Sequence, residues 1–423
     1  MLKKTDAGVA LKLDEGDPLS DYRDRFYFDE EEITYFDGNS LGRLPKATIA
    51  LGHDLIQRQW GQCLLRSWTD DWMALSARIG DKIAQLVGAD KGEVLVADST
   101  SVVLYKLVVA ARQAQTGRSG IVTDDMNFPS DLYIIQAAAQ LVNSHHTIKM
   151  VGSDNDITIP SKEIVETIDD DTALVVLSHV SFKSSYVYDM ARITQKAHEH
   201  GALVLWDVSH SAGALPIDFT ACSVDLGVGC SYKYLNGGPG APAFLYIRKM
   251  HQSGLFNPIS GWFGHHSPFD FVKNYKPAGT IDRFLTGTPP VISIALIEPG
   301  VDLILEAGIE NIRQKSVNQT DYLITLWDAG LADLGFVLKT PRESDVRGSH
   351  ISFGHIDGHR INRALRDYYS IYTDFRAPDN LRIGITPLYM TYQDIHKVFS
   401  AMQEIVVKKL YEKYPEVSER VII

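Results

Sequence analysis

A lysine stands where this sequence could carry out covalent chemistry. Lys233 lies in the segment SYKYLN (231–236), which follows an apolar run and precedes a glycine-rich turn at 237–240. Burial lowers the pKa of a lysine and leaves its amine nucleophilic, which is what a Schiff-base lysine requires. Most lysines are solvated surface charges instead, but the flanking aromatic residues and glycines disfavour that alternative here.

Asp207 and His210 form a second candidate pair, directly after the apolar segment ALVLW (202–206). A carboxylate at the end of a buried strand needs a cationic partner, and a protonated pyridine nitrogen would serve. His210 could reach the same ring. Taken alone, the D-x-x-H spacing is a weak signal, because an aspartate in this position often only caps the next turn.

Small polar residues and one aromatic ring follow three other predicted strands. Thr100 and Ser101 begin a predicted helix, where hydroxyl and N–H groups could bind a phosphate or only cap the helix. Phe128 could stack on a planar cofactor or belong to the core, and Asp131 follows in the same loop. Ser178 could hydrogen-bond a ring substituent or act as a cap. Ligands of open α/β sheets bind outside the carboxyl ends of the strands, so these residues would share one site.

The elements that would position these residues alternate between short apolar strands and helices. Strands are predicted at 94–96, 120–122, 172–177, 202–206, 224–228 and 243–247, and helices at 100–113, after Pro129 and at 190–200. Continuous valine and leucine runs are typical of strands buried on both faces. The pattern therefore predicts an α/β fold with a mainly parallel sheet.

The two ends of the chain show a different pattern of apolar residues. Helical patterns occupy 45–60 and 72–87 before the alternating region and 291–328 after it, followed by strands near 349–353 and 380–385 and an amphipathic helix over 395–405. We expect a large α/β domain at 61–309 and a smaller α+β domain at 310–423. An N-terminal segment, 1–60, would pack near the small domain.

Composition and charge exclude several classes of protein. The chain has 423 residues, with 41 Lys and Arg against 53 Asp and Glu, so its net charge is −12. A dedicated nucleic-acid or anionic-membrane binder would be basic instead. Cys63, Cys222 and Cys230 form no C-x-x-C pair, which favours a reducing compartment. No segment approaches the roughly 20 apolar residues of a membrane span, and residues 1–17 lack the unbroken apolar stretch that a signal peptide would show. We expect a cytoplasmic protein with a small-molecule partner and neither nucleic acid nor membrane.

Other chemistries lack their motifs. The sequence contains no G-x-x-x-x-G-K-[ST] phosphate loop, no strand-linked G-x-G-x-x-G, no H-E-x-x-H and no G-x-S-x-G. The histidines at 145–146, 198–200 and 265–266 lack the spacing of zinc ligands. No metal site is expected.

Four motifs, in this order and spacing, resemble the kynureninase family. They are FPSD (128–131), WDVSHSAG (206–213), SYKYLN (231–236) and GWFGH (261–265), and the resemblance runs from about Gly38 to Tyr389. Kynureninases are pyridoxal-phosphate (PLP) enzymes of fold type I in the aminotransferase class V group. The resemblance implies a homodimer whose large domain holds a mainly parallel seven-stranded sheet, beside a smaller α+β C-terminal domain.

The resemblance also implies roles for the cofactor-binding residues. Lys233 would bind PLP covalently, and Asp207 would pair with the pyridinium nitrogen. Tyr232 would bind phosphate and shuttle protons. The remaining residues at the cofactor would be Thr100 and Ser101 at the phosphate and Phe128, Asp131, Ser178 and His210 at the ring.

Four other residues carry roles implied by the resemblance. Trp262 and Thr288 would reach the phosphate of the second subunit. Arg382 would bind the substrate carboxylate, since its planar fork suits a carboxylate, and Ser40 would lie near the substrate pocket. The threonine at position 288 is also the residue type that resembles bacterial members of the family, whose substrate is mostly kynurenine rather than its 3-hydroxy form.

The implied reaction is hydrolysis of the Cβ–Cγ bond of the amino acid L-kynurenine, giving anthranilate and L-alanine, in tryptophan catabolism. The chain has FKSS (182–185) where members usually show Tyr-x-Thr-Gly, so its aryl preference stays open. An aminotransferase or a cysteine desulfurase of the same class is an alternative, although a desulfurase needs a later cysteine and none follows Cys230. A non-enzymatic binding protein is a further alternative, and the presence of Lys233 and Asp207 argues against it.

Overall fold

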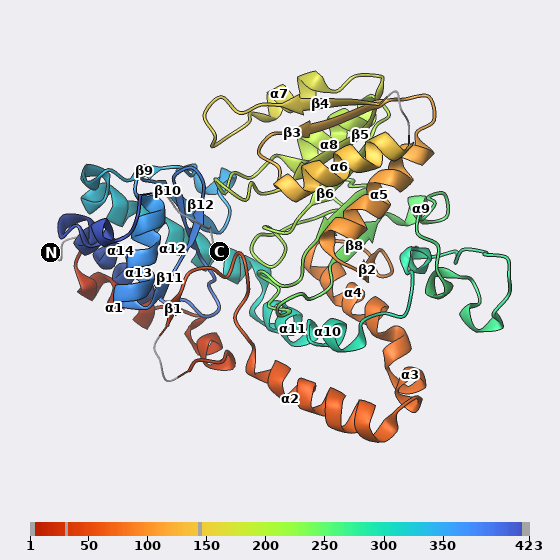
Figure 1. Ribbon diagram of the computed structural model, residues 1–423, viewed down its shortest axis with the longest axis horizontal. Coiled ribbons are helices and arrows are strands. Elements are labelled where there is room, and N and C mark those ends of the chain that lie inside the picture. Colours follow the sequence, from red (N-terminus) through yellow and green to blue (C-terminus); the bar gives the residue numbers. More distant parts are fainter. Residues whose placement is uncertain (1–4, 30–32, 143–145, 417–423) are drawn as a thin grey trace.

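A computed structural model describes residues 5–29, 33–142 and 146–416. Its centre is a seven-stranded sheet in the order β2-β8-β7-β6-β5-β3-β4 (Figure 1). The strands are β2 (Val94–Val96), β3 (Gly120–Asp124), β4 (Thr147–Val151), β5 (Thr172–Ser178), β6 (Leu203–Asp207), β7 (Leu226–Gly229) and β8 (Phe244–Ile247). β8 runs antiparallel to both of its neighbours, and the other neighbouring strands are parallel. The predicted mainly parallel, seven-stranded sheet is therefore confirmed.

Helices cover both faces of this sheet, which explains the continuous apolar strands. They are α4 (Leu75–Leu86), α5 (Thr100–Ala114), α6 (Pro129–Val142), α7 (Ser161–Thr167), α8 (Met190–Glu199) and α9 (Lys249–Gln252). Every residue of β5 is buried, and its side chains alternate between two apolar clusters. Val175 and Leu177 belong to the apolar cluster that also contains residues of α4, α7 and α8, whereas Leu174 and Val176 belong to the cluster that contains residues of α5 and α6. The structure thus has the three layers that a parallel sheet requires.

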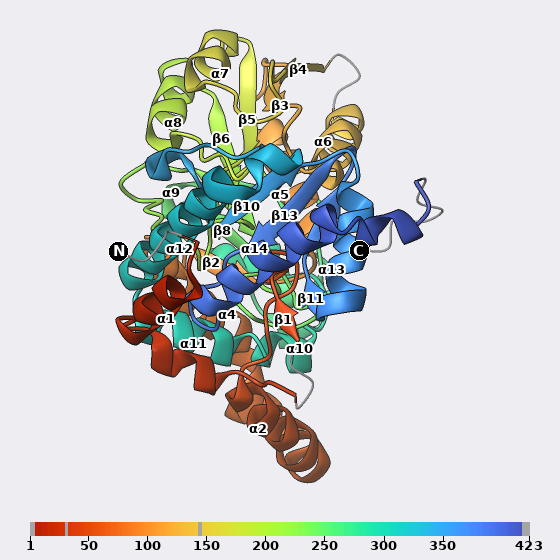
Figure 2. The ribbon, with the colours of Figure 1, turned by 90° about the vertical axis from the view of Figure 1, so that its left-hand side faces the viewer.

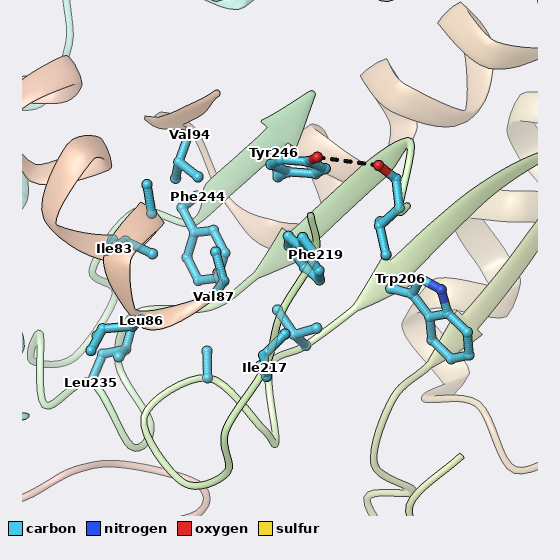
Figure 3. Close-up of a cluster of buried hydrophobic side chains, with 14 of the residues drawn as sticks. Ile83, Leu86, Val87, Val94, Trp206, Ile217, Phe219, Leu235, Phe244 and Tyr246 are labelled. Carbon is cyan, nitrogen blue, oxygen red and sulfur yellow. Dashed lines mark hydrogen bonds between the residues drawn. The ribbon is translucent and has the colours of Figure 1, made fainter. Parts of the chain in front are cut away.

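The core beneath α4 is rich in aromatic side chains. Figure 3 shows Phe219, Phe244 and Tyr246 gathered between α4 and the strands β7 and β8. The rings of Phe219 and Tyr246 lie 4.7 Å apart, and the Tyr246 hydroxyl donates a hydrogen bond to the Val224 carbonyl at 3.2 Å. The polar tip of this ring is therefore satisfied inside the core.

The smaller C-terminal part contains a four-stranded antiparallel sheet in the order β12-β13-β10-β9. Its strands are β9 (Val337–Leu338), β10 (His350–Gly354), β12 (Asp374–Arg376) and β13 (Asn380–Gly384), and its helices are α12 (Ile309–Gly330), α13 (Gly358–Tyr369) and α14 (Tyr392–Val407). These helices face the viewer in Figure 2, with the large sheet behind them. α10 (Val291–Ala295) and α11 (Glu298–Ala307) lead into this part from the large domain.

The N-terminal segment contributes to the small domain's core. Ala10 in α1 (Ala7–Glu15) and Phe36 belong to the apolar cluster of α12, α13 and α14. The Asp14 carboxylate accepts hydrogen bonds from the backbone N–H groups of Tyr392 and Gln393 at 2.7 and 3.0 Å, at the start of α14. In addition, β1 (Thr34–Tyr35) pairs in parallel with β11 (Ile371–Tyr372). The domain boundaries at residues 61 and 310 stay predictions.

Several elements differ from the sequence prediction, among them α7 and α13, which it did not include. β4 was missed because TIKMV is an edge strand, partly exposed, without an unbroken apolar run. The predicted helix at 45–60 is α2 (Lys46–Asp54) continued by a π-helix over Leu55–Cys63, followed by the short α3 (Arg66–Asp70). In Figure 1 α2 projects from the body, and Ile49, Ile56 and Trp60 are exposed rather than packed in the core.

Every helix within residues 5–29, 33–142 and 146–416 is too short or too polar to span a bilayer.

Gly80 allows α4 to lie directly on β2. A methyl group at this position would overlap the carbonyl oxygen of Val94, which belongs to the backbone and cannot move aside. We expect Gly80→Ala to lower the free energy of unfolding by about 1–3 kcal/mol, measured by denaturant titration. Gly279→Ala is the matched control, since a methyl group there meets no heavy atom within 4 Å. Equal stability of the two variants would contradict this account of the α4–β2 contact.

Candidate active site

A cavity of about 520 Å³ opens where the large sheet meets the small domain. Most of the residues predicted for the site line it, namely Ser40, Thr100, Ser101, Phe128, Asp131, Ser178, Asp207, His210, Tyr232, Lys233 and Arg382. The carboxyl ends of β5 and β6 bring two of them together, because Ser178 and Asp207 are register partners. The loop after β7 adds Tyr232 and Lys233. The carboxyl edge of the sheet, where the sequence predicted the site, therefore forms one wall of this cavity.

Lys233 lies against a buried histidine. Its Nζ is 3.0 Å from His210 Nε2 and 5.9 Å from the centre of the Phe128 ring. Burial, and then the positive charge of Lys233, lower the pKa of His210 well below its ordinary value. The imidazole is thus neutral at pH 7 and can accept a hydrogen bond from the lysine. This contact restricts where the amine can point.

Two carboxyl groups share the inner end of the cavity. Asp131 and Asp207 are only 3% and 7% exposed. Burial and the negative charge of Asp207 raise the pKa of Asp131 well above its ordinary value, and Asp131 Oδ2 has no hydrogen-bond partner. Asp207 Oδ1 accepts a hydrogen bond from the Ser209 N–H at 2.8 Å. A protonated ring nitrogen would supply the positive charge that this pair favours, so the residues fit a pyridinium.

Hydroxyl groups gather at the N-termini of two helices that face the same cavity. Ser101, at the start of α5, lies 3.1 Å from Ser130, at the start of α6, measured between the two Oγ atoms. Thr100 lines the cavity beside them. Hydroxyl and backbone N–H groups at helix N-termini favour anions, so this corner fits a phosphate. Ser130 was not among the predicted site residues, although it lies inside the FPSD motif.

The side chain of Ser178 is held by a neighbouring amide. Its hydroxyl donates a hydrogen bond to Asn127 Oδ1 at 2.6 Å. The same oxygen accepts a hydrogen bond from the Phe128 backbone N–H at 3.0 Å. The ends of β5 and of the loop before α6 are fixed to each other, which sets the distance between Ser178 and the Phe128 ring.

The opposite wall of the cavity is cationic. Arg382 donates hydrogen bonds from Nε to Asp374 at 2.8 Å, from Nη2 to the Ser40 hydroxyl at 3.1 Å and from Nη1 to the Phe182 carbonyl at 2.5 Å. Its side chain is 1% exposed. Arg376 Nε lies 3.1 Å from the same Asp374 carboxylate. Carboxylates are the natural ligands of such a wall.

Trp262 and Thr288 lie outside this cavity. Both are exposed, and Trp262 packs against Phe263 and Phe271 with ring centres 4.4 and 6.3 Å apart. Within one chain the structure does not bring them to the other predicted residues. Their predicted action on a second subunit stays a prediction.

Some cavity residues carried no signal in the sequence. Among them are Tyr35, Asp37, Asn362, Arg366, Tyr372, Thr373 and Arg376, from the N-terminal segment and the small domain. A pattern of apolar residues cannot show which distant loops will meet a sheet edge. Among the described residues, no group of three or more His, Cys, Asp or Glu side chains could hold a metal ion. His145 is not one of the residues that the structure describes.

Comparison with known proteins decides the family. A model of the kynureninase C-terminal domain matches residues 312–402. The chain is 40% identical to a kynureninase of Pseudomonas fluorescens over 95% of both chains, and 38% identical to one of Burkholderia pseudomallei over 98% of both. The chain belongs to the kynureninase family.

Solved structures of low identity share the fold. A cysteine desulfurase of Thermococcus onnurineus superimposes with a TM-score of 0.76 at 19% identity, covering 94% of this chain and 98% of that one. The cysteine desulfurase CsdA of Escherichia coli gives 0.77 at 18% identity, covering 92% and 98%. These enzymes have PLP fold type I, which confirms the predicted fold class.

Asp37 should make stability depend on pH. Burial and the charge of Asp374 raise its pKa to about 6, so the folded protein favours the protonated carboxyl. That stabilisation is complete below the unfolded pKa of about 4 and is lost as the pH rises through about 6. We expect Asp37→Asn to lose less stability than the parent between pH 4 and pH 7, by on the order of 1 kcal/mol in denaturant titrations. Asp21→Asn, at an exposed position, should track the parent, and parallel curves for all three proteins would refute the assignment.

Proposed function

We propose that this protein is a PLP-dependent hydrolase acting on carbon–carbon bonds in ketonic substances, which cleaves the Cβ–Cγ bond of L-kynurenine to anthranilate and L-alanine. The supporting observation is one cavity that joins a lysine, a carboxyl pair and a buried arginine, in a chain 40% identical to a kynureninase. The reaction would serve tryptophan catabolism.

The cavity residues divide into those for the ring and those for the phosphate. Lys233 would hold the cofactor aldehyde covalently, and Asp207 would keep the pyridine nitrogen protonated. The ring would lie among Phe128, Asp131, Ser178 and His210, and the phosphate among Thr100, Ser101 and Tyr232. When bound, PLP supplies an electron sink for bond cleavage beside the substrate α-carbon.

Three side chains would move or hold protons and charge. The free amine of Lys233 would take the proton from the substrate Cα, with neutral His210 at 3.0 Å orienting it. Burial raises the pKa of the Tyr232 phenol, which is therefore protonated at pH 7 and can donate to an oxygen or carbon that gains negative charge. Arg382, with Ser40 at 3.1 Å, would hold the α-carboxylate.

A homodimer is part of the proposal. Apolar side chains are exposed on the segment that follows α2, among them Ile56, Trp60 and Leu65, and around Trp262 and Phe271. Large apolar side chains exposed close together in this way are typical of a contact between proteins. A second copy would cover it and would receive Trp262 and Thr288 at its phosphate. We place the enzyme in the cytoplasm, where its three free cysteines would stay reduced.

Lys233→Ala should abolish covalent attachment of PLP. The parent protein should absorb visible light with PLP and gain the cofactor's mass after borohydride reduction, and the variant should do neither. Incubation of the parent with L-kynurenine should release anthranilate, detected by fluorescence. Transamination of alanine without any anthranilate would refute the hydrolase and support an aminotransferase.

Mixing two inactive variants tests the shared site. In a hybrid of Lys233→Ala and Trp262→Ala chains, the subunit that keeps Lys233 faces an intact Trp262 of its partner. We expect the mixture to recover roughly a quarter of the parent's kynurenine activity, because half of the dimers are hybrids with one complete site each. No recovery, in a mixture shown by mass spectrometry to contain hybrids, would place Trp262 in its own subunit's chemistry.

A further inference from the structure

Two arginines of the small domain meet on a single carboxylate in the cavity. Arg376 on β12 and Arg382 on β13 both contact Asp374, with their Nε atoms at 3.1 and 2.8 Å. Asp374 and Arg376 are two residues apart on one strand, so their side chains share a face of the sheet. The two guanidinium groups are therefore held side by side.

The two arginines differ in what they can still bind. Both Nη atoms of Arg382 and its Nε already donate hydrogen bonds to Asp374, Ser40 and the Phe182 carbonyl. In the described part of the chain Arg376 donates no hydrogen bond, and its Nε is buried without a hydrogen-bond partner although it lies 3.1 Å from Asp374. The side chain lines the cavity. Arg376 is 22% exposed, against 1% for Arg382. Its donors are open toward the ligand space.

The surrounding charges leave a place for one more anion. Asp374 is shared by the two arginines and can neutralise only one of them, while the nearby Asp37, whose pKa is raised to about 6, adds its negative charge only as the pH rises through that value. Burial and the charge of Arg382 lower the pKa of the Arg376 guanidinium, as expected where positive charge is in excess. A bound carboxylate would relieve both effects.

The proposed reaction makes such an anion. Water adds to the Cγ carbonyl, the Cβ–Cγ bond breaks with its electron pair going to Cβ, and Cβ takes a proton to become the methyl group of alanine. Cγ keeps both oxygens as a carboxylic acid, which loses a proton. The substrate therefore brings one carboxylate, the α-carboxylate, into the cavity. Two carboxylates, one on each product, are present before the products leave.

We propose that Arg376 binds the carboxylate that the reaction creates at Cγ, while Arg382 binds the α-carboxylate. This inference rests on the proposed function. The two carboxyl carbons are separated in the substrate skeleton only by Cα and Cβ, which matches two guanidinium groups that meet on one oxygen of Asp374. Before cleavage, the same donors face the oxygen on which negative charge develops as water adds.

Binding of each product to the PLP-loaded protein tests the assignment. Calorimetric titrations with anthranilate and with L-alanine would be made on the parent, Arg376→Gln and Arg376→Lys. We expect Arg376→Gln to weaken anthranilate binding roughly tenfold to a hundredfold and to leave alanine binding within about twofold, with the lysine variant in between. Arg363→Gln is the matched control, because this exposed arginine of the same domain is not among the residues that line the cavity. It should bind both products as the parent does.

Separate outcomes overturn the inference and the function. If the parent releases anthranilate from kynurenine but Arg376→Gln binds anthranilate as tightly as the parent, the inference alone is wrong. If Arg376→Gln weakens the binding of alanine as much as the binding of anthranilate, Arg376 acts through Asp374 and Arg382, and the inference is again wrong. A parent that binds PLP but neither cleaves kynurenine nor binds anthranilate would refute the function and the inference with it.

Discussion

The burial of charged groups at the carboxyl edge of the large sheet is the constraint on which the site depends. Asp131 and Asp207 are almost fully buried, and Lys233 is partly buried beside the neutral His210. Isolated charges in such surroundings are costly, so each needs a partner of fixed position. The strand ends supply those positions, because the parallel register sets Asp207 beside Ser178 and the next loop delivers Lys233. Fold and chemistry are thus determined by the same edge.

The small domain is attached to this edge through polar contacts with one loop. Arg382 and Ser352 donate hydrogen bonds to the carbonyls of Phe182 and Lys183, and the backbone N–H of Gly348 donates to the carbonyl of Ser185 at 2.7 Å. The Tyr234 hydroxyl adds a bond to the Ser349 carbonyl at 3.0 Å. The arginine wall is therefore held at a set place opposite Lys233, and a shift of the loop after β5 would move that wall.

The sequence predicted the large domain well because its signals are local. The runs that became β5 and β6 are buried on both faces, and the polar residues that follow such strands must meet at one edge. The cationic wall was harder, since Arg376 and Asp37 come from distant segments that only tertiary packing brings to the cavity. In the predicted helix at 45–60, Ile56 and Trp60 follow a helical spacing, yet both are exposed in the single chain, on the π-helix that continues α2. Periodicity shows that a face is apolar but not what covers it.

The loop after β5 shows how this chain departs from its family while keeping the fold. Where members usually have Tyr-x-Thr-Gly, Ser185 adopts a φ of 68°, which costs a non-glycine residue roughly 1 kcal/mol. Its hydroxyl accepts a hydrogen bond from the His350 N–H at 3.3 Å, a contact that glycine could not make. Phe182 replaces the tyrosine and packs edge-to-face on Phe128 with ring centres 5.2 Å apart. The ring expected to lie on the cofactor is thus supported by an apolar neighbour without a hydroxyl, which makes this part of the cavity wall less polar than a tyrosine would.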